Sequence, residues 1–255
     1  MDEGEEIAGH LPGIAVVATR CETFQGTADL RLVCRCDDGS DYAVKDQLRN
    51  PHLPHQEWLC TQLGELVGIA SPHIRVVKLA ADECFGSRWE SGMETQDWWI
   101  RAHNGDIDFQ LIAPTISRIF AYDLFVHNVD RHLTNYIVRR QYSGHSVLSF
   151  DYSQAWLFSG FPLPPLPLHS QTKTIQAMRA MRHLFGDFIH QNEVKSICNK
   201  LRQIKTETIE RIISEHPNNW LTETQKCEIF NWWKSDRRLH RIHQLQEGIA
   251  NGDYL

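Results

Sequence analysis

Asp130 and Asn135 lie five residues apart in a polar stretch that follows a long apolar segment. Transfer of a phosphoryl group from a nucleoside triphosphate needs a carboxylate beside the attacking hydroxyl and oxygen ligands for Mg²⁺. An Asp and an Asn on one short loop can supply both. Asp151, directly after the next apolar run, adds an oxygen ligand that can reach the same ion. The spacing of Asp130 and Asn135 alone is weak evidence, because both residue types are common in turns.

Lys45 could supply a cation for the same chemistry. It ends the run Tyr42-Ala43-Val44-Lys45, which has the composition of a strand. A lysine on a strand can neutralise phosphate oxygens when an acid on a nearby helix holds it in place. Glu57 is the first candidate for that acid and Glu65 the second. The plainer alternatives are a lysine at a sheet edge and a solvated helix acid.

The first third of the chain is predicted to be β-rich. Apolar residues alternate along 30–36, and Asp38-Gly39 is a strong turn signal, so residues 29–45 predict an antiparallel hairpin. A polar stretch at 91–95 is expected to connect two lobes. The other elements expected before it are a strand at 14–19, a helix that begins near Pro51 and Pro54 and stops at Gly68, and strands at 74–79 and 84–89.

From Asp97 onward the pattern is mostly helical. Residues 111–127 predict a largely buried helix, and two short strands, 136–138 and 147–150, follow the polar stretch. The Pro-rich segment 161–168 predicts a loop. Further helices are expected at 172–185, 190–203, 205–215 and 222–248, the last with a capping box between Thr222 and Gln225.

Composition limits the function classes. The chain has 255 residues, 42% hydrophobic and 23% charged, which indicates a globular protein with a sizeable core. Its net charge of −6 and its lack of a long basic run argue against direct nucleic-acid binding as the main function. The acidic start and the absence of a long apolar segment predict a protein without a membrane span, located in the cytoplasm.

Two features have plain interpretations. The seven cysteines lack the paired spacing of a zinc site, and we expect them to be buried apolar thiols, with Cys34 and Cys36 on one face of a strand. The basic run at Lys234, Arg237, Arg238 and Arg241 predicts a solvated helix face, with a docking patch as the alternative.

Three segments together resemble the HipA-like kinases: Tyr42-Ala43-Val44-Lys45, the run from Asn128 to Asn135, and Phe150-Asp151-Tyr152-Ser153. The pattern D-R-H-x-x-N followed by an Asp after a strand is also similar to phosphoinositide kinases. The order of the later features favours the HipA-like side, and the resemblance covers most of residues 14–250.

The resemblance implies a role for each matching residue. Lys45 would hold the ATP phosphates and pair with Glu57. Asp130 would orient or deprotonate the acceptor hydroxyl, and Asn135 and Asp151 would bind Mg²⁺. His132 would lie beside the γ-phosphate or brace the loop, and Arg131 would pair with a carboxylate or phosphate. Gly26 is the one glycine where a phosphate-binding loop is expected, which is fewer than such loops usually contain.

The sequence thus predicts an α+β, two-lobed protein-kinase-like fold. Residues 1–95 would form a small β-rich N-lobe with one helix, and residues 96–255 a larger, mostly helical C-lobe. ATP and Mg²⁺ would bind between the lobes, and a protein Ser or Thr is the expected acceptor. The alternatives are a lipid or small-molecule kinase and a non-catalytic nucleotide-binding or protein-interaction module.

Overall fold

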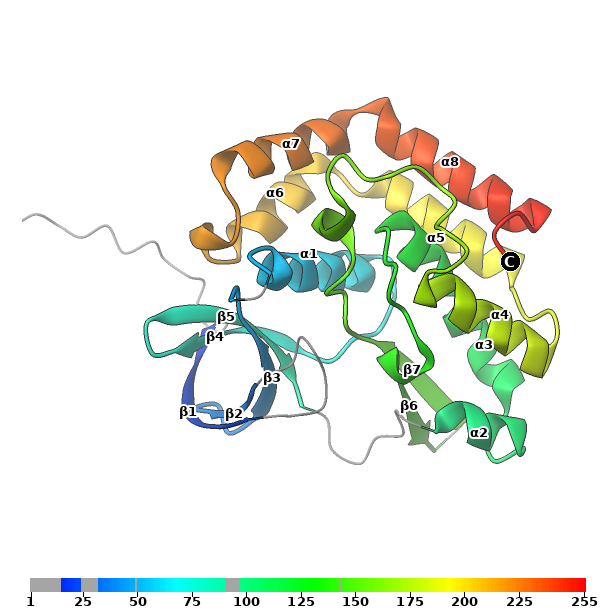
Figure 1. Ribbon diagram of the computed structural model, residues 1–255, viewed down its shortest axis with the longest axis horizontal. Coiled ribbons are helices and arrows are strands. Elements are labelled where there is room, and N and C mark those ends of the chain that lie inside the picture. Colours follow the sequence, from blue (N-terminus) through cyan, green and yellow to red (C-terminus); the bar gives the residue numbers. More distant parts are fainter. Residues whose placement is uncertain (1–14, 24–31, 49, 90–96, 143) are drawn as a thin grey trace, which may run out of the picture.

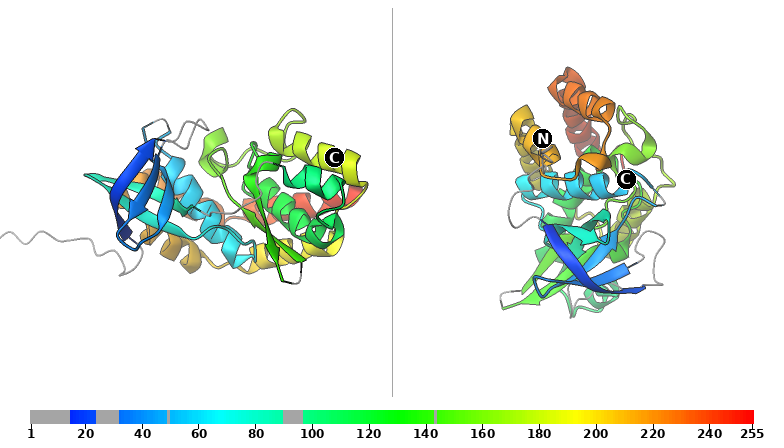
Figure 2. Two further views of the ribbon diagram at one scale, coloured as in Figure 1. Left: turned by 90° about the horizontal axis from the view of Figure 1, so that it is seen from below. Right: turned by 90° about the vertical axis from the view of Figure 1, so that its left-hand side faces the viewer.

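The computed structural model describes residues 15–23, 32–48, 50–89, 97–142 and 144–255. It has a mixed α+β architecture with a β-rich N-terminal region and a helical C-terminal region, as the sequence predicts (Figure 1). The strands of the first region lie at one end of the molecule and most helices at the other (Figure 2). The boundary expected near residue 95 falls in 90–96, outside the described residues, so the division at 95 stays a prediction.

Five strands close into a barrel in the order β1-β2-β3-β5-β4, with β1 and β4 parallel and the other neighbours antiparallel. Tyr42, Val44 and Val77 are buried in its interior cluster. Because side chains alternate along a strand, Lys45 points out of the barrel, away from Val44. The strands are β1 (Ala15–Thr23), β2 (Leu32–Cys36), β3 (Asp41–Lys45), β4 (Ile74–Leu79) and β5 (Asp82–Arg88).

One glycine in the barrel is required by close packing. Gly86 of β5 pairs with Val44 of β3. A Cβ atom on Gly86 would lie 2.4 Å from Cγ2 of Val77, which is closer than carbon atoms can approach. Only a residue without a side chain therefore fits there while the barrel interior stays filled.

Helix α1 (Leu53–Leu66) packs outside the barrel, on the side that Lys45 faces. It begins with Pro54 in its first turn and ends just before Gly68, whose φ of +87° suits glycine, as the sequence predicts. The indole of Trp58 donates to the carbonyl of Ile212, 3.1 Å away, which ties α1 to the helical region. One continuous core therefore includes α1 and the C-terminal helices.

Helix α3 (Phe109–Phe125) is the centre of the helical region and packs against α4, α5, α8 and β7. Asp108 caps its start by accepting a hydrogen bond from the backbone N–H of Gln110. The remaining elements are α2 (Trp98–His103), β6 (Tyr136–Gln141), β7 (Gly144–Ser149), α4 (Lys173–Phe185), α5 (Gln191–Gln203), α6 (Thr206–Ser214), α7 (Glu223–Lys234), α8 (Asp236–Asn251) and short 3-10 turns at Leu133–Asn135, Trp156–Ser159 and Asn218–Trp220.

The helix expected at 222–248 is two helices, so that prediction was wrong in one respect. Thr222 and Gln225 form the expected capping box at the start of α7. Ser235 then adopts an extended conformation, with ψ 160°, between α7 and α8. Its hydroxyl donates to the carbonyl of Trp232, so a local side-chain hydrogen bond replaces the helical one.

The basic run is also not a uniformly solvated face. Arg241 of α8 is only 4% exposed. Its guanidinium donates to the carbonyls of Leu124, Phe125 and Pro164 at 2.6–2.7 Å. Burial lowers its pKa to about 10. Arg241 thereby fastens the Pro-rich segment and the end of α3 to α8, a role that the sequence pattern did not indicate.

The cysteines differ from expectation at one pair. Cys36, Cys60, Cys84 and Cys198 are buried thiols, but Cys21 and Cys34 form a disulfide and Cys227 is exposed. Cys21 and Cys34 are 13 residues apart in sequence, yet they are direct partners across β1 and β2. That pairing depends on strand register, which the spacing of the cysteines does not show.

No helix in the described part of the chain is long and apolar enough to cross a bilayer.

Candidate active site

A buried arginine organises the polar loop between α3 and β6. Both oxygens of Asp123, on α3, accept hydrogen bonds from Arg131 at 2.9 and 3.0 Å, and both side chains are 0% exposed. Asn128 also donates to Asp123, at 2.9 Å. Although burial acts to lower it, the pKa of Arg131 is raised by Asp123. This ion pair fixes the loop to α3, the central helix of the helical region.

Arg131 also joins the loop to the end of the β6–β7 hairpin. One of its amino groups donates to the carbonyl of Asn135, at 3.1 Å, and to the carbonyl of Phe150. One guanidinium therefore holds the backbone of Asn135 and that of Phe150, the residue before Asp151. A carboxylate or a phosphate was the expected partner of Arg131, and the partner is the carboxylate of Asp123.

Lys45 joins the barrel to this loop region. Its ammonium lies 2.5 Å from a carboxylate oxygen of Glu57 on α1 and 2.9 Å from one of Asp151, a residue 106 positions later in the chain. Lys45 is only 7% exposed and Glu57 2%. The ion pair expected between Lys45 and Glu57 is thus present, and Glu65, the second choice, lies exposed on the same helix.

Two carboxylates share this one buried ammonium, and their pKa values shift in opposite directions. Burial, and then repulsion from Asp151, raises the pKa of Glu57 to about 7, although Lys45 opposes the shift. For Asp151, burial acts to raise the pKa, but Lys45 and the hydrogen bonds from Ser153 hold it well below its usual value. Asp151 is therefore ionised at neutral pH. Its φ of +65° marks a strained backbone, as functional residues often have.

The three loop residues lie beside one another. Asn135 donates through its amide nitrogen to the carbonyl of Asp130, 3.3 Å away, and this leaves its amide oxygen available. Burial, the largest effect, lowers the pKa of His132, and the nearby carboxylates of Asp130 and Asp151 oppose it. Its Nδ1 is 2.7 Å from the hydroxyl of Thr134.

The donor set of Asn135 and Asp151 fits Mg²⁺. An amide oxygen and an ionised carboxylate are hard ligands, and Mg²⁺ usually takes only one or two protein groups and fills the rest of its shell with water and phosphate oxygens. Within the described residues, no group of three or more His, Cys, Asp or Glu could hold a metal ion by itself.

Gly26, the expected phosphate-loop glycine, lies outside the described residues. The other six expected residues come together: Lys45, Glu57 and Asp151 in one ion-pair cluster, and Asp130, His132 and Asn135 on the adjoining loop.

Three residues of the site were missed by sequence reasoning. These are Asp123, which pairs with Arg131, Lys173, whose ammonium is 2.7 Å from Asp130, and Thr174 beside it. The sequence did contain a signal for Asp123, because a carboxylate inside an otherwise apolar helix needs a buried partner. No signal pointed to Lys173 and Thr174, which lie 43 residues after their partners Asp130 and Arg131.

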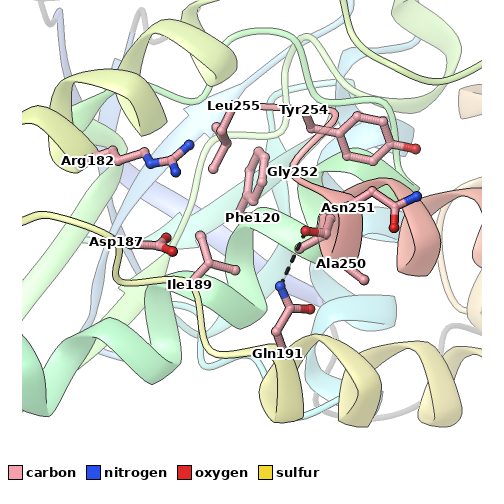
Figure 3. Close-up of a pocket in the computed structure, with 11 residues that line it drawn as sticks. Phe120, Arg182, Asp187, Ile189, Gln191, Ala250, Asn251, Gly252, Tyr254 and Leu255 are labelled. Carbon is pink, nitrogen blue, oxygen red and sulfur yellow. Dashed lines mark hydrogen bonds between the residues drawn. The ribbon is translucent and has the colours of Figure 1, made fainter.

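A separate hollow of about 190 Å³ lies between α3, the start of α5 and the C-terminal residues (Figure 3). Arg182, Asp187 and Gln191 are among the side chains around it. None of the six candidate residues lines it, so it is distinct from the candidate active site.

The comparison with protein-family models agrees with the motifs. The family model of the HipA-like kinases matches residues 17–248. Among solved structures, a Helicobacter pylori proinflammatory kinase, CtkA, is similar at 14% identity and a TM-score of 0.48, with 92% of this chain and 99% of CtkA covered. HipA of Shewanella oneidensis MR-1, in complex with HipB and operator DNA, is similar at 12% identity and a TM-score of 0.48, with 81% of this chain and 60% of HipA covered. No curated protein matches the chain.

Proposed function

Because the chain belongs to the HipA-like kinase family, we propose that it transfers the γ-phosphoryl group of ATP to a hydroxyl, with Mg²⁺ and with a protein serine or threonine as acceptor. A kinase-type function follows from the family. The acceptor, the metal and the residue roles are the proposal. Its main support is one contact, the Lys45 ammonium held between Glu57 and Asp151, since this cation and metal-ligand pairing is what triphosphate binding requires.

Each residue has a role in the proposal. Lys45 neutralises phosphate oxygens of ATP and is held by Glu57. Asn135 and Asp151 hold Mg²⁺, which neutralises charge on the phosphates when it is bound. Asp130 orients the acceptor hydroxyl and accepts its proton. His132 braces the loop or contacts the γ-phosphate. Gly26 belongs to the loop that covers the phosphates.

We propose that residues 1–95 and 96–255 form two lobes and that ATP binds between them. Lys45 supports this placement, because the barrel supplies the cation and the helical region supplies Asp151. We also propose a cytoplasmic location. The Cys21–Cys34 disulfide argues against this location, because cytoplasmic thiols are normally reduced.

The test is a labelling experiment. Purified protein is incubated with γ-labelled ATP and Mg²⁺ in a cell extract, alongside the variants Asp130→Asn and Asp151→Asn. Both variants should fold and lose transfer to the assay background. Asp253→Asn, which alters an exposed carboxylate elsewhere, is the matched control and should label as the wild type does.

The outcomes separate the candidate functions. Label on serine or threonine of a protein supports the proposal. Label on a lipid or small molecule would show that the acceptor belongs to that class and is not a protein. ATP binding with no transfer would indicate a non-catalytic nucleotide-binding module. Unchanged transfer in Asp130→Asn and Asp151→Asn would remove the catalytic assignment altogether.

A further inference from the structure

The first residue of α4 faces the candidate catalytic carboxylate. The ammonium of Lys173 lies 2.7 Å from a carboxylate oxygen of Asp130. The Lys173 side chain is 57% exposed and that of Asp130 only 16%. A lysine on a long flexible stem can therefore leave this contact while the carboxylate stays in place. Any catalytic role of this contact rests on the proposed function, because it concerns the same reaction.

A buried hydroxyl fixes the start of α4 to the loop. The side chain of Thr174, which is fully buried, donates to the carbonyl of Asn128 at 2.6 Å. The hydroxyl oxygen of Thr174 also accepts a hydrogen bond from the backbone N–H of Arg131, at 3.0 Å. These contacts lie on either side of Asp130 in the sequence. The proximity of Lys173 to Asp130 is thus built into the fold and is not a chance meeting of two surface chains.

The two lysines of the site stand at opposite ends of it. Lys45 is buried and shared by two carboxylates, whereas Lys173 is exposed and held by one. The charges of Asp130, Asp151 and Lys173 all act on the imidazole of His132, so the three groups lie near this one ring. A phosphoryl group that moves from the metal side toward Asp130 would end its path beside Lys173.

We propose that Lys173 is a catalytic residue that binds the oxygens of the transferred phosphoryl group. In the free protein its ammonium pairs with Asp130. When ATP binds, the ammonium turns to the γ-phosphoryl oxygens and frees Asp130 for the acceptor hydroxyl. A bond forms between the acceptor oxygen and the γ-phosphorus, and the bond from that phosphorus to the β–γ bridging oxygen breaks. ADP keeps the bonding electron pair, and the acceptor proton passes to Asp130.

The first measurement is the rate of transfer by Lys173→Met and Lys173→Arg. Removing one group that stabilises charge in a transition state costs about 100-fold in kcat, and we expect a loss of that order for Lys173→Met. Lys173→Arg, which retains the charge, should recover part of it. The unfolding midpoint of both variants should match the wild type, because exposed ion pairs contribute little to stability. Lys195→Met, at an exposed lysine of α5, is the matched control.

The second measurement does not depend on turnover. The affinities of ADP and of a non-hydrolysable ATP analogue are measured with Mg²⁺ for the wild type and for Lys173→Met. Contact with the γ-phosphate predicts a several-fold loss of affinity for the analogue and none for ADP. Lys195→Met should change neither affinity.

The two measurements separate this inference from the proposed function. If the wild type transfers phosphate and Lys173→Met matches it in kcat and in both affinities, the role of Lys173 is overturned while the kinase function stands. A faster Lys173→Met enzyme also overturns it, because Lys173 would then only mask Asp130. If the wild type transfers nothing but Lys173→Met loses affinity for the analogue alone, the phosphate contact stands and the proposed function fails.

Discussion

Helices α1 and α4 flank the two ends of the candidate site and hold it by different means. α1 is buried along most of its length and carries the polar side chains of His55, Gln56 and Glu57 into the interior. α4 is hydrogen-bonded to the loop through the buried hydroxyl of Thr174, and its first residue, Lys173, is exposed. The end that holds Lys45 is thus fixed by buried partners, whereas the end at Asp130 keeps a movable cation. We infer that the nucleotide end is preorganised and the acceptor end adjustable.

The buried contacts of α1 extend well beyond Glu57. Gln56 donates to the carbonyl of Ala155, 2.8 Å away. Nδ1 of His55 lies 3.0 Å from Nε2 of His216, and both rings are almost completely buried. These contacts join α1 to the segment after Asp151 and to the end of α6. A disturbance of α1 should therefore affect stability and nucleotide binding together.

The largest expected effect is that of Glu57→Ala at pH 8, where the Glu57 carboxyl is ionised. Loss of this hydrogen bond between buried charged groups costs about 3 kcal/mol of unfolding free energy, although Lys45 keeps Asp151 as a partner. ATP affinity should fall as well, since Lys45 loses its support. Denaturant unfolding and nucleotide titration measure the two effects.

The matched control for Glu57→Ala is Glu65→Ala, on the same helix. Glu65 is exposed, and its replacement should change stability by no more than about 0.5 kcal/mol. Equal effects of the two variants would contradict the assignment of Glu57 as the partner that fixes Lys45.

The histidine pair predicts a loss of stability at acidic pH. Burial lowers the pKa of His216 to about 4 and that of His55 well below its usual value. Between pH 6.5 and 4 the unfolded chain binds a proton at His216 that the folded protein excludes, so stability falls as pH falls. With a shift from 6.5 to about 4, His216 alone accounts for roughly 3 kcal/mol.

The readout is the difference in unfolding free energy between the wild type and His216→Gln. Glu57 acts in the opposite direction, because its raised pKa favours the folded state as pH falls from about 7, so the wild-type slope alone is not diagnostic. The advantage of the wild type over His216→Gln should shrink from pH 6.5 to 4. His243→Gln, at a histidine whose side chain is 60% exposed, should show no such change.

Local signals account for the part of the fold that the sequence predicted. The turn at Asp38-Gly39, the helix stop at Gly68 and the capping box at Thr222 each depend on a few neighbouring residues, and each is present. The pairing of Lys45 with Glu57 was also predicted, because a strand lysine and an acid on the following helix are close in the chain.

Long-range contacts account for what was missed. The Cys21–Cys34 disulfide depends on the register of β1 against β2, and the burial of Arg241 depends on where α8 crosses the end of α3. Lys173 reaches Asp130 only because a Pro-rich segment returns the chain to the loop. In each case the partner is set by tertiary packing, which residue spacing does not encode.

Thr174→Val should weaken the acceptor end selectively. Valine keeps the shape of threonine but leaves the carbonyl of Asn128 and the N–H of Arg131 without their partner, at a cost of about 1–3 kcal/mol of unfolding free energy. Transfer should fall because Asp130 lies between these groups, whereas ADP affinity should not change. Thr174→Ser, which keeps the hydroxyl, is the control. If ADP affinity fell as much as transfer does, the nucleotide end and the acceptor end of the site would not be separable.

The smallest expected effect is that of Thr172→Ala, at the start of α4. The Thr172 hydroxyl caps the helix by accepting from the N–H of Ile175, and loss of such a cap costs about 1 kcal/mol. Thr222→Ala removes the cap of α7 at a similar cost, so the two variants should match in denaturant unfolding. Only Thr172→Ala should also slow transfer, because only that helix start carries Lys173. Equal transfer rates in the two variants would show that the start of α4 does not position the acceptor end.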